Sequence, residues 1–186
     1  MVTRYSPVIR YTATAAMVCM AALLPVLSLP DFSMNTLVTY GIMYAQAAIL
    51  SYGTRVLMRN NLTRFRPYYH DGRELRAEHR HDSFPSGHTT VAFMSAAFFA
   101  AAVSQEHPDS RWKRPAIAGS YAFATGIGAM RMLSGMHFFT DVIAGAAIGS
   151  FYGWLIPYLH RNTARNGNSN FPVKISRNGL LVALRL

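Results

Sequence analysis

Long apolar segments separated by short polar ones limit what this chain can fold into. The apolar segments are residues 11–30, 32–54, 83–105, 115–130 and 138–159. A helix that crosses a bilayer needs about 20 mainly apolar residues to cover the hydrocarbon core. The pattern therefore predicts an all-α fold, a polytopic transmembrane bundle of about five to six helices.

The composition agrees with a membrane setting. Hydrophobic residues make up 51% of the chain and charged residues only 14%, against roughly 25% charged in soluble domains. The 18 Lys and Arg outnumber the 8 Asp and Glu, and such an excess suits an anionic membrane surface or an anionic ligand. No nucleic-acid-binding motif is visible, so we expect no nucleic-acid partner. Cys19 is the single cysteine, which excludes an intrachain disulfide.

The first apolar segment has two interpretations. Arg4 and Arg10 precede it, as basic residues precede the core of a signal peptide. However, residues 11–30 exceed the usual apolar core of about 7–15 residues. We therefore expect a retained membrane helix, antiparallel to the next one because the connection at residues 29–33 is short.

Three polar clusters stand where apolar segments begin or end. The first follows the second segment, the second opens the third segment, and the third joins the fourth segment to the fifth. Their residues are Arg59 with Arg66-Pro67, then Pro85-Ser86-Gly87-His88, then Arg131 with His137 and Asp141. In a bundle with antiparallel neighbours all three reach the same end. The sequence thus predicts one polar site at a membrane interface, with side chains suited to a phosphate.

His137 and Asp141 are the strongest candidates for catalysis. Their spacing of four places them on one helical face in adjacent turns. An Asp that accepts the proton of one imidazole nitrogen leaves the other nitrogen free to attack as a nucleophile. The alternative is an incidental pair on a solvated helix. Ionisable residues within membrane segments are costly and usually functional, which favours the catalytic interpretation.

Ser86, Gly87 and His88 open an apolar segment, where unpaired backbone N–H groups of a helix bind anions. Ser86 can cap the helix and donate, and Gly87 permits close approach of a phosphate. His88 would then protonate the leaving oxygen. The alternative is that Ser86 is only an N-cap and His88 an ordinary residue of the first turn.

Arg59, Arg66 and Arg131 supply fork-shaped donors for the non-bridging oxygens of a phosphate. The competing explanation is that they are positive-inside arginines at helix ends. That explanation weakens because all three are expected at the same end of the bundle.

A metal site is the main chemical alternative, because His79, His81, Asp82 and His88 are close in sequence. Their spacing matches no zinc pattern. Two-metal phosphatases also need several bridging carboxylates. We therefore predict no metal and no cofactor.

The motifs Arg-x6-Arg-Pro, Pro-Ser-Gly-His and Arg-x5-His-x3-Asp, in this order over residues 59–141, resemble the signature of a known superfamily. It is the type 2 phosphatidic acid phosphatase and vanadium haloperoxidase superfamily, and the helical layout resembles its membrane branch. The resemblance implies a metal-independent phosphatase with His137 as the nucleophile, Asp141 orienting it and His88 as the general acid. The implied phosphate-binding residues are Arg59, Arg66, Ser86, Gly87 and Arg131.

The chain departs from the family pattern in three places. The first motif usually opens with Lys where this chain has Arg59, which keeps the charge but changes the geometry. A Ser commonly precedes the arginine of the third motif, where this chain has Met130. Membrane members often have six helices, and five apolar segments would fit loss of the first one.

The expected function is removal of phosphate from a membrane lipid. Candidate substrates by resemblance are phosphatidic acid, phosphatidylglycerol phosphate, undecaprenyl diphosphate and the phosphates of lipid A. The expected partners are this lipid and the bilayer, with no obligatory protein partner. The alternatives are a non-catalytic binder of anionic lipids and a vanadate-dependent haloperoxidase. Resemblance to bacterial members suggests the inner membrane, with the site facing the periplasm.

The domain organisation follows from a change in composition near residue 160. Residues 1–160 are expected to form the transmembrane phosphatase domain, and residues 161–186 a polar tail. Asn178-Gly179 between two apolar runs is a β-hairpin signal. A disordered or membrane-apposed tail is the alternative.

Overall fold

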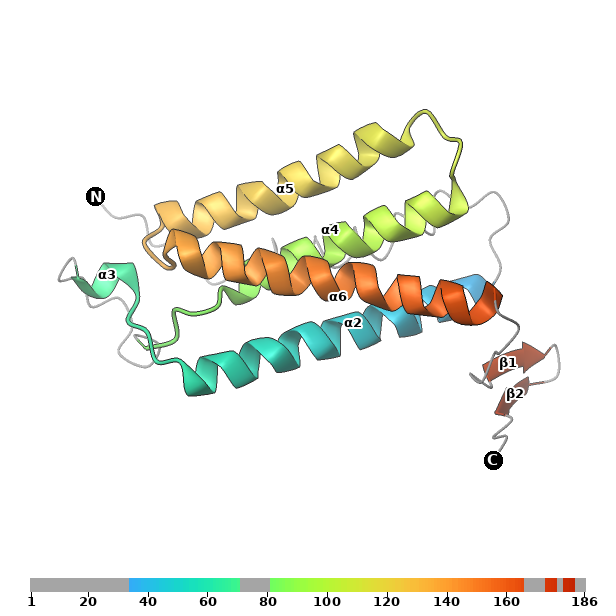
Figure 1. Ribbon diagram of the computed structural model, residues 1–186, viewed down its shortest axis with the longest axis horizontal. Coiled ribbons are helices and arrows are strands. Elements are labelled where there is room, and N and C mark those ends of the chain that lie inside the picture. The colour runs from blue at the N-terminus through green and yellow to red at the C-terminus, as the bar shows by residue number, and fades with distance from the viewer. Residues whose placement is uncertain (1–33, 71–80, 166–172, 177–178, 183–186) are drawn as a thin grey trace.

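Four long helices lie side by side in the described part of the chain, with a one-turn helix at one end (Figure 1). The computed structural model describes residues 34–70, 81–165, 173–176 and 179–182. The helices are α2 (Met34–Asn61), α3 (Pro67–His70), α4 (Gly87–Glu106), α5 (Lys113–Leu133) and α6 (Phe139–Arg165). The predicted helical bundle is confirmed. The helix expected over residues 11–30 lies outside the described residues.

Helix α4 is the central helix, because the other three long helices pack on it. Met94, Phe98 and Ala102 form one buried cluster together with residues of α2 and α6. Ala92 and Ala96 form a second cluster, with α5. Consequently the segment that opens α4, Pro-Ser-Gly-His, lies amid the ends of the other helices.

Helix α6 meets α4 backbone to backbone along a row of glycines. A Cβ atom on Gly145 would lie 2.6 Å from the carbonyl oxygen of Ser86, and one on Gly149 would lie 2.2 Å from that of Thr90. At Gly153 the nearest atom would be the Met94 carbonyl oxygen, at 2.3 Å. No real Cβ fits at such distances. The small residues of this segment therefore permit close packing of the two helices.

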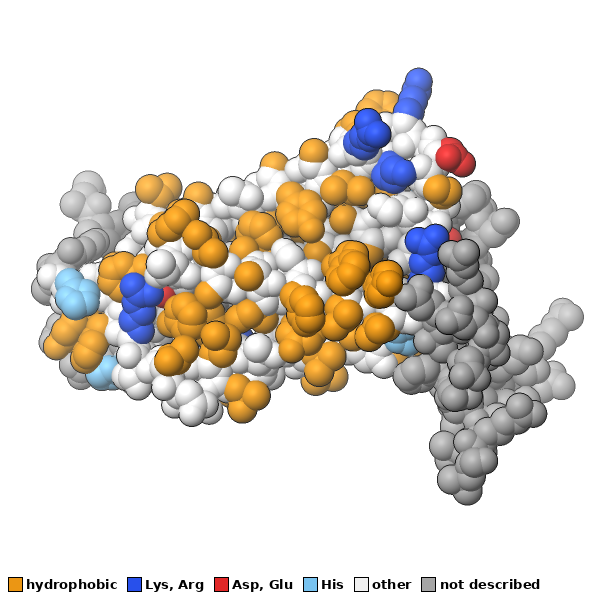
Figure 2. Space-filling view, in the orientation of Figure 1, with side chains coloured by type: hydrophobic (Ala, Val, Ile, Leu, Met, Phe, Trp, Pro, Cys, Tyr) orange, Lys and Arg blue, Asp and Glu red, His pale blue; other side chains and the backbone are white. Residues whose placement is uncertain are grey.

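Two of the described helices, α4 and residues 139–161 of α6, are long and apolar enough to cross a membrane. Figure 2 shows hydrophobic side chains over the middle of one face, with Lys and Arg near the two ends. The exposed large hydrophobic residues of α6 include Ile143, Phe151 and Trp154. An exposed apolar surface of this kind fits contact with lipid.

The helix boundaries differ most from the predicted ones at three places. Helix α2 continues past the expected end at residue 54 to Asn61, so Arg55 and Arg59 are helical. Long arginine side chains allow this, because they carry their charge away from the helix axis. Helix α4 begins at Gly87 instead of residue 83, and α6 continues past residue 160 to Arg165.

The C-terminal segment contains two short strands, β1 (Val173–Ser176) and β2 (Gly179–Val182). They pair antiparallel, with Val173 opposite Val182 and Ser176 opposite Gly179. Residues 177 and 178, which include the Asn of the hairpin signal, lie outside the described residues. The division into residues 1–160 and 161–186 stays a prediction.

Candidate active site

The structure brings the three polar clusters together at one end of the bundle, where α2 and α5 end and α4 and α6 begin (Figure 1). Backbone hydrogen bonds join the segments that carry them. The Ser86 N–H donates to the Asp141 carbonyl at 3.0 Å, and the Tyr68 N–H donates to the Gly135 carbonyl at 3.0 Å. These bonds fix the second cluster to the third, and the chain after the first cluster to the α5–α6 loop.

His137 is buried, with 3% of its surface exposed, and its imidazole has a defined orientation. The Nδ1 atom lies 2.7 Å from the Ser83 carbonyl oxygen. A carbonyl oxygen only accepts hydrogen bonds, so Nδ1 carries the proton and the lone pair is on Nε2. Burial lowers the pKa of His137, and the nearby charges of Arg66 and Arg131 act in the same direction, against Asp141. The imidazole is therefore held in the neutral form that can act as a nucleophile.

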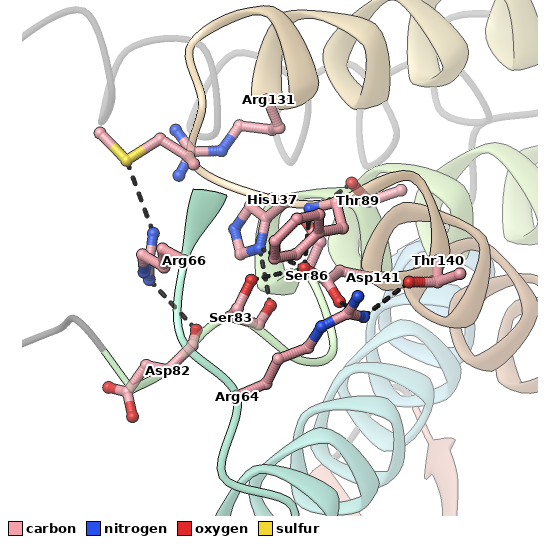
Figure 3. Close-up of polar contacts among 12 residues, drawn as sticks. Arg64, Arg66, Asp82, Ser83, Ser86, Thr89, Arg131, His137, Thr140 and Asp141 are labelled. Carbon is pink, nitrogen blue, oxygen red and sulfur yellow. Dashed lines mark hydrogen bonds and ion pairs between the residues drawn. The ribbon is translucent and has the colours of Figure 1, made fainter. Parts of the chain in front are cut away.

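Asp141 is fully buried, and several donors surround its carboxylate (Figure 3). Oδ2 accepts from the Ser83 hydroxyl at 2.5 Å and from the Phe138 N–H at 2.8 Å. Oδ1 accepts from Arg64 Nη1 at 2.7 Å. The distance from Oδ2 to His137 Nδ1 is longer, at 3.8 Å. Asp141 therefore holds the hydroxyl of Ser83, and the carbonyl of Ser83 holds the imidazole.

Ser83 was not identified from the sequence. Its side chain is fully buried, and it contacts both members of the predicted His137–Asp141 pair. The contact with His137 is made by the main-chain carbonyl of Ser83, which any residue type would possess. The sequence carried no signal for it beyond its position two residues before Pro85.

Arg64 was also missed, because it is one of the unspecified residues between Arg59 and Arg66 in the first motif. Its Nη1 bonds to Thr140 Oγ1 at 2.6 Å as well as to Asp141, and its guanidinium lies 4.3 Å from the centre of the Phe138 ring. A usable signal did exist. In extended chain, residues two apart point to the same side, so Arg64 could have been grouped with Arg66.

The Pro-Ser-Gly-His segment opens α4 as expected, but Ser86 does not cap the helix with its side chain. Its buried hydroxyl instead lies 2.9 Å from Thr89 Oγ1. Ser86 is thus the N-cap residue by position, and the capping expected from its side chain is not observed. His88 is half-buried in the first turn, where the charges of Arg131 and Arg55 act on it.

The three predicted arginines differ in their surroundings. Arg66 donates to the Asp82 carbonyl at 3.2 Å and to Met136 Sδ at 3.6 Å, and burial lowers its pKa. Figure 3 places Arg131, from the last turn of α5, near Arg66 and His137. Arg59 instead lies 3.7 Å from the Asp82 carboxylate and is about one third exposed. Arg66 and Arg131 are thus the two arginines of the signature that flank His137.

Within residues 34–70 and 81–165, no three His, Cys, Asp or Glu side chains are placed to hold a metal ion. His81 packs against the Phe65 ring, with 4.2 Å between the ring centres. His79, part of the metal alternative, lies outside the described residues.

Comparison with known families gives a clear result. The family model of the PAP2 superfamily matches residues 33–165. The chain belongs to the PAP2 superfamily. This match includes all three polar clusters and every long helix of the described residues, and it confirms the resemblance seen in the motifs. Together with the apolar helices α4 and α6, it indicates a membrane protein.

This chain is similar to two known proteins, one by sequence and one by structure. The lipid A 1-phosphatase of Porphyromonas gingivalis is 36% identical over 74 residues, which is 40% of this chain and 15% of that protein. The chain therefore spans only a small part of that relative. The crystal structure of the first transmembrane PAP2 type phosphatidylglycerolphosphate phosphatase from Bacillus subtilis has a TM-score of 0.49 and 21% identity. Its match covers 85% of this chain and 89% of that one.

Proposed function

We propose that this protein is an integral membrane phosphatase that removes phosphate from a lipid phosphate or diphosphate through a phosphohistidine. One observation carries the proposal. Nδ1 of the buried His137 imidazole is bound to the Ser83 carbonyl, and burial and the flanking Arg66 and Arg131 lower the pKa of this ring. An orientated neutral imidazole among guanidiniums is suited to attack on a phosphoryl group. Membership of the PAP2 superfamily supports the same chemistry.

In the first step, Nε2 of His137 attacks phosphorus, and the bond from phosphorus to the lipid oxygen breaks as the N–P bond forms. His88, in the first turn of α4, donates a proton to the departing oxygen. Arg66, Arg131 and the N–H groups at the start of α4 stabilise the charge on the equatorial oxygens. The lipid alcohol leaves with its chains still in the bilayer.

In the second step, water attacks the phosphohistidine. His88, now neutral, accepts a proton from that water, and the N–P bond breaks. Inorganic phosphate is released, and both histidines return to their starting protonation states. This cycle needs no metal ion, which is part of the proposal.

The cation that forms on His137 during the reaction is stabilised from its Nδ1 side. The Nδ1–H donates to the Ser83 carbonyl, and the buried carboxylate of Asp141 lies 3.8 Å away. Because Nδ1 is occupied, the phosphoryl group can only be accepted at Nε2. Asp141 acts partly through Ser83, whose hydroxyl it binds.

The substrate class follows from the location of the site at one end of an apolar bundle. A lipid can present its headgroup there while its chains stay against exposed residues such as Phe139 and Ile143. Candidates are phosphatidic acid, phosphatidylglycerol phosphate, undecaprenyl diphosphate and lipid A phosphates. Partial similarity to a lipid A 1-phosphatase supports including the last. The proposed location is a bacterial inner membrane, with the site facing the periplasm.

The test measures phosphate release by the purified protein in detergent micelles, with excess chelator, from a panel of these lipids. His137→Ala is compared with His160→Ala, a matched change at the other end of α6, where His160 bonds to Gln46. We expect the parent and His160→Ala to be active and His137→Ala to lose on the order of a thousandfold or more. Full activity of His137→Ala, or activity of the parent only with added divalent metal, would contradict the proposal.

A further inference from the structure

Arg55 occupies a position beside the Pro-Ser-Gly-His segment that the three-motif signature does not include. It stands on α2 one turn before Arg59. A Cβ atom on Gly87 would lie 2.6 Å from Arg55 Nε and 2.8 Å from its Cζ. The guanidinium therefore fills the space that a side chain at Gly87 would need. Gly87 lacks a side chain at the point where this charged group reaches the start of α4.

The hydrogen bonding of Arg55 is incomplete. Its Nε is buried and has no hydrogen-bond partner among the described residues. The guanidinium does contact the Tyr52 ring, with 5.7 Å from Cζ to the ring centre. A buried donor without an acceptor is costly, and such groups call for an explanation such as an absent ion. Here the donor lies at a helix start, where backbone N–H groups already favour an anion.

Arg55 and Arg59 differ in what surrounds them. Arg59 is engaged with the Asp82 carboxylate and is about one third exposed. Asp82 also attracts Arg55, but the charge of Arg55 acts in addition on both His88 and Arg66. Two guanidiniums that repel each other beside a histidine form a site that an anion would neutralise. Of the two arginines on α2, Arg55 is therefore the better placed to contact an anion held at Gly87.

We infer that Arg55 is a phosphate-binding residue, which donates to a non-bridging oxygen of the phosphoryl group held at the start of α4. It acts together with Arg66 and Arg131, and it supplies from α2 the contact that the family motif would assign to Arg59. This inference rests on the proposed function. It concerns binding and charge stabilisation only, so it adds no covalent step to the cycle.

The experiment measures binding of inorganic phosphate to the full-length protein in micelles by titration calorimetry, without turnover. The variants are Arg55→Gln, Arg55→Lys and Arg59→Gln. The control is Arg111→Gln, in the loop at the other end of the bundle beside Trp112. We expect Arg55→Gln to weaken phosphate binding by about tenfold to a hundredfold, as for loss of a charge-assisted hydrogen bond. Arg55→Lys should lose less, Arg59→Gln less than Arg55→Gln, and Arg111→Gln nothing.

Phosphate binding by Arg55→Gln equal to that of the parent would overturn the inference, as would a larger loss in Arg59→Gln. If Arg55→Gln does not fold, Arg55→Lys provides the comparison. It keeps the positive charge but replaces the forked donors of the guanidinium with a single ammonium group. Turnover of the lipid panel is measured in parallel. An active parent with unchanged phosphate binding in Arg55→Gln refutes only the role of Arg55. A parent that binds phosphate through Arg55 but releases none from any lipid refutes only the proposed function.

Discussion

The two ends of the bundle are similar in composition and different in connection. Each carries arginines, a histidine and a carboxylate, and the carboxylate is exposed at the far end and buried at the site end. At the far end, Glu106 accepts a hydrogen bond from Tyr40, and His160 bonds to Gln46. These are separate pairs. At the site end, Asp141 joins Arg64, Ser83 and the backbone of Phe138, and Ser83 leads on to His137. Convergence on one buried carboxylate, more than the number of charges, distinguishes the site.

The strongest way to break this comparison is to neutralise one carboxylate at each end. Asp141→Asn removes the charge that stabilises the imidazolium and disturbs the hydrogen bond from Ser83. We expect kcat/KM for a lipid phosphate to fall by roughly a thousandfold to ten-thousandfold, as for comparable catalytic aspartates. Glu106→Gln should stay within about twofold of the parent, because Glu106 makes no contact with the site.

Both variants are measured by phosphate release under identical conditions. A loss in Glu106→Gln as large as that in Asp141→Asn would show that the two ends are energetically equivalent. In that case the difference in their connections would have no functional meaning.

The glycine row on α6 allows a second comparison, because it runs from the site end toward the other end. Gly145 faces the Ser86 carbonyl, and Gly153 faces the Met94 carbonyl. An added methyl group at either position forces α4 and α6 apart. We expect Gly145→Ala and Gly153→Ala each to cost about 1–3 kcal/mol in the free energy of unfolding. Only Gly145→Ala, which displaces Ser86, should also lower kcat/KM of the folded protein, by roughly tenfold.

Gly126→Ala on α5 is the matched control, since no atom lies within 4 Å of a Cβ placed there. It should be neutral or stabilising by up to about 1 kcal/mol. Thermal unfolding in micelles gives the stability, and phosphate release below the unfolding transition gives the activity. Equal activity losses in Gly145→Ala and Gly153→Ala would mean that helix separation acts on the whole bundle and not on the site alone.

The smallest expected effect is on the pH dependence of activity. Burial and the charges of Arg66 and Arg131 lower the pKa of His137, and the imidazole must be neutral to attack. As pH falls, kcat/KM should therefore stay high to a pH below the ordinary imidazole pKa of about 6.5 and decline only beneath it. Arg66→Gln removes one charge that lowers this pKa, so its acidic decline should begin at higher pH than in the parent. Arg111→Gln, at the other end, should leave the profile unchanged, and an equal displacement in both variants would contradict this account.

The helices and their gathering of the motifs could be predicted because they depend on simple regularities. Apolar length specified the helices, and antiparallel connection placed Arg66, Ser86 and His137 at one end. The partners of these residues could not be predicted in the same way. The pairing of Arg59 with Asp82 and the approach of Arg55 to Gly87 depend on how far α2 extends. The end of α2 is hard to predict because Arg55 and Arg59 are compatible with either a helix or a loop.

The contact between His137 and Ser83 has a consequence for how this site can change over time. Its acceptor is part of the main chain, so no substitution at residue 83 can delete it. The tautomer of His137, the proposed nucleophile, is thereby protected from substitutions at residue 83, provided that the chain keeps its path between residues 83 and 86. Alanine scanning would register the hydroxyl of Ser83 and miss the carbonyl. In this protein, the group that orients the imidazole of His137 is a backbone carbonyl, which no amino-acid substitution at residue 83 removes.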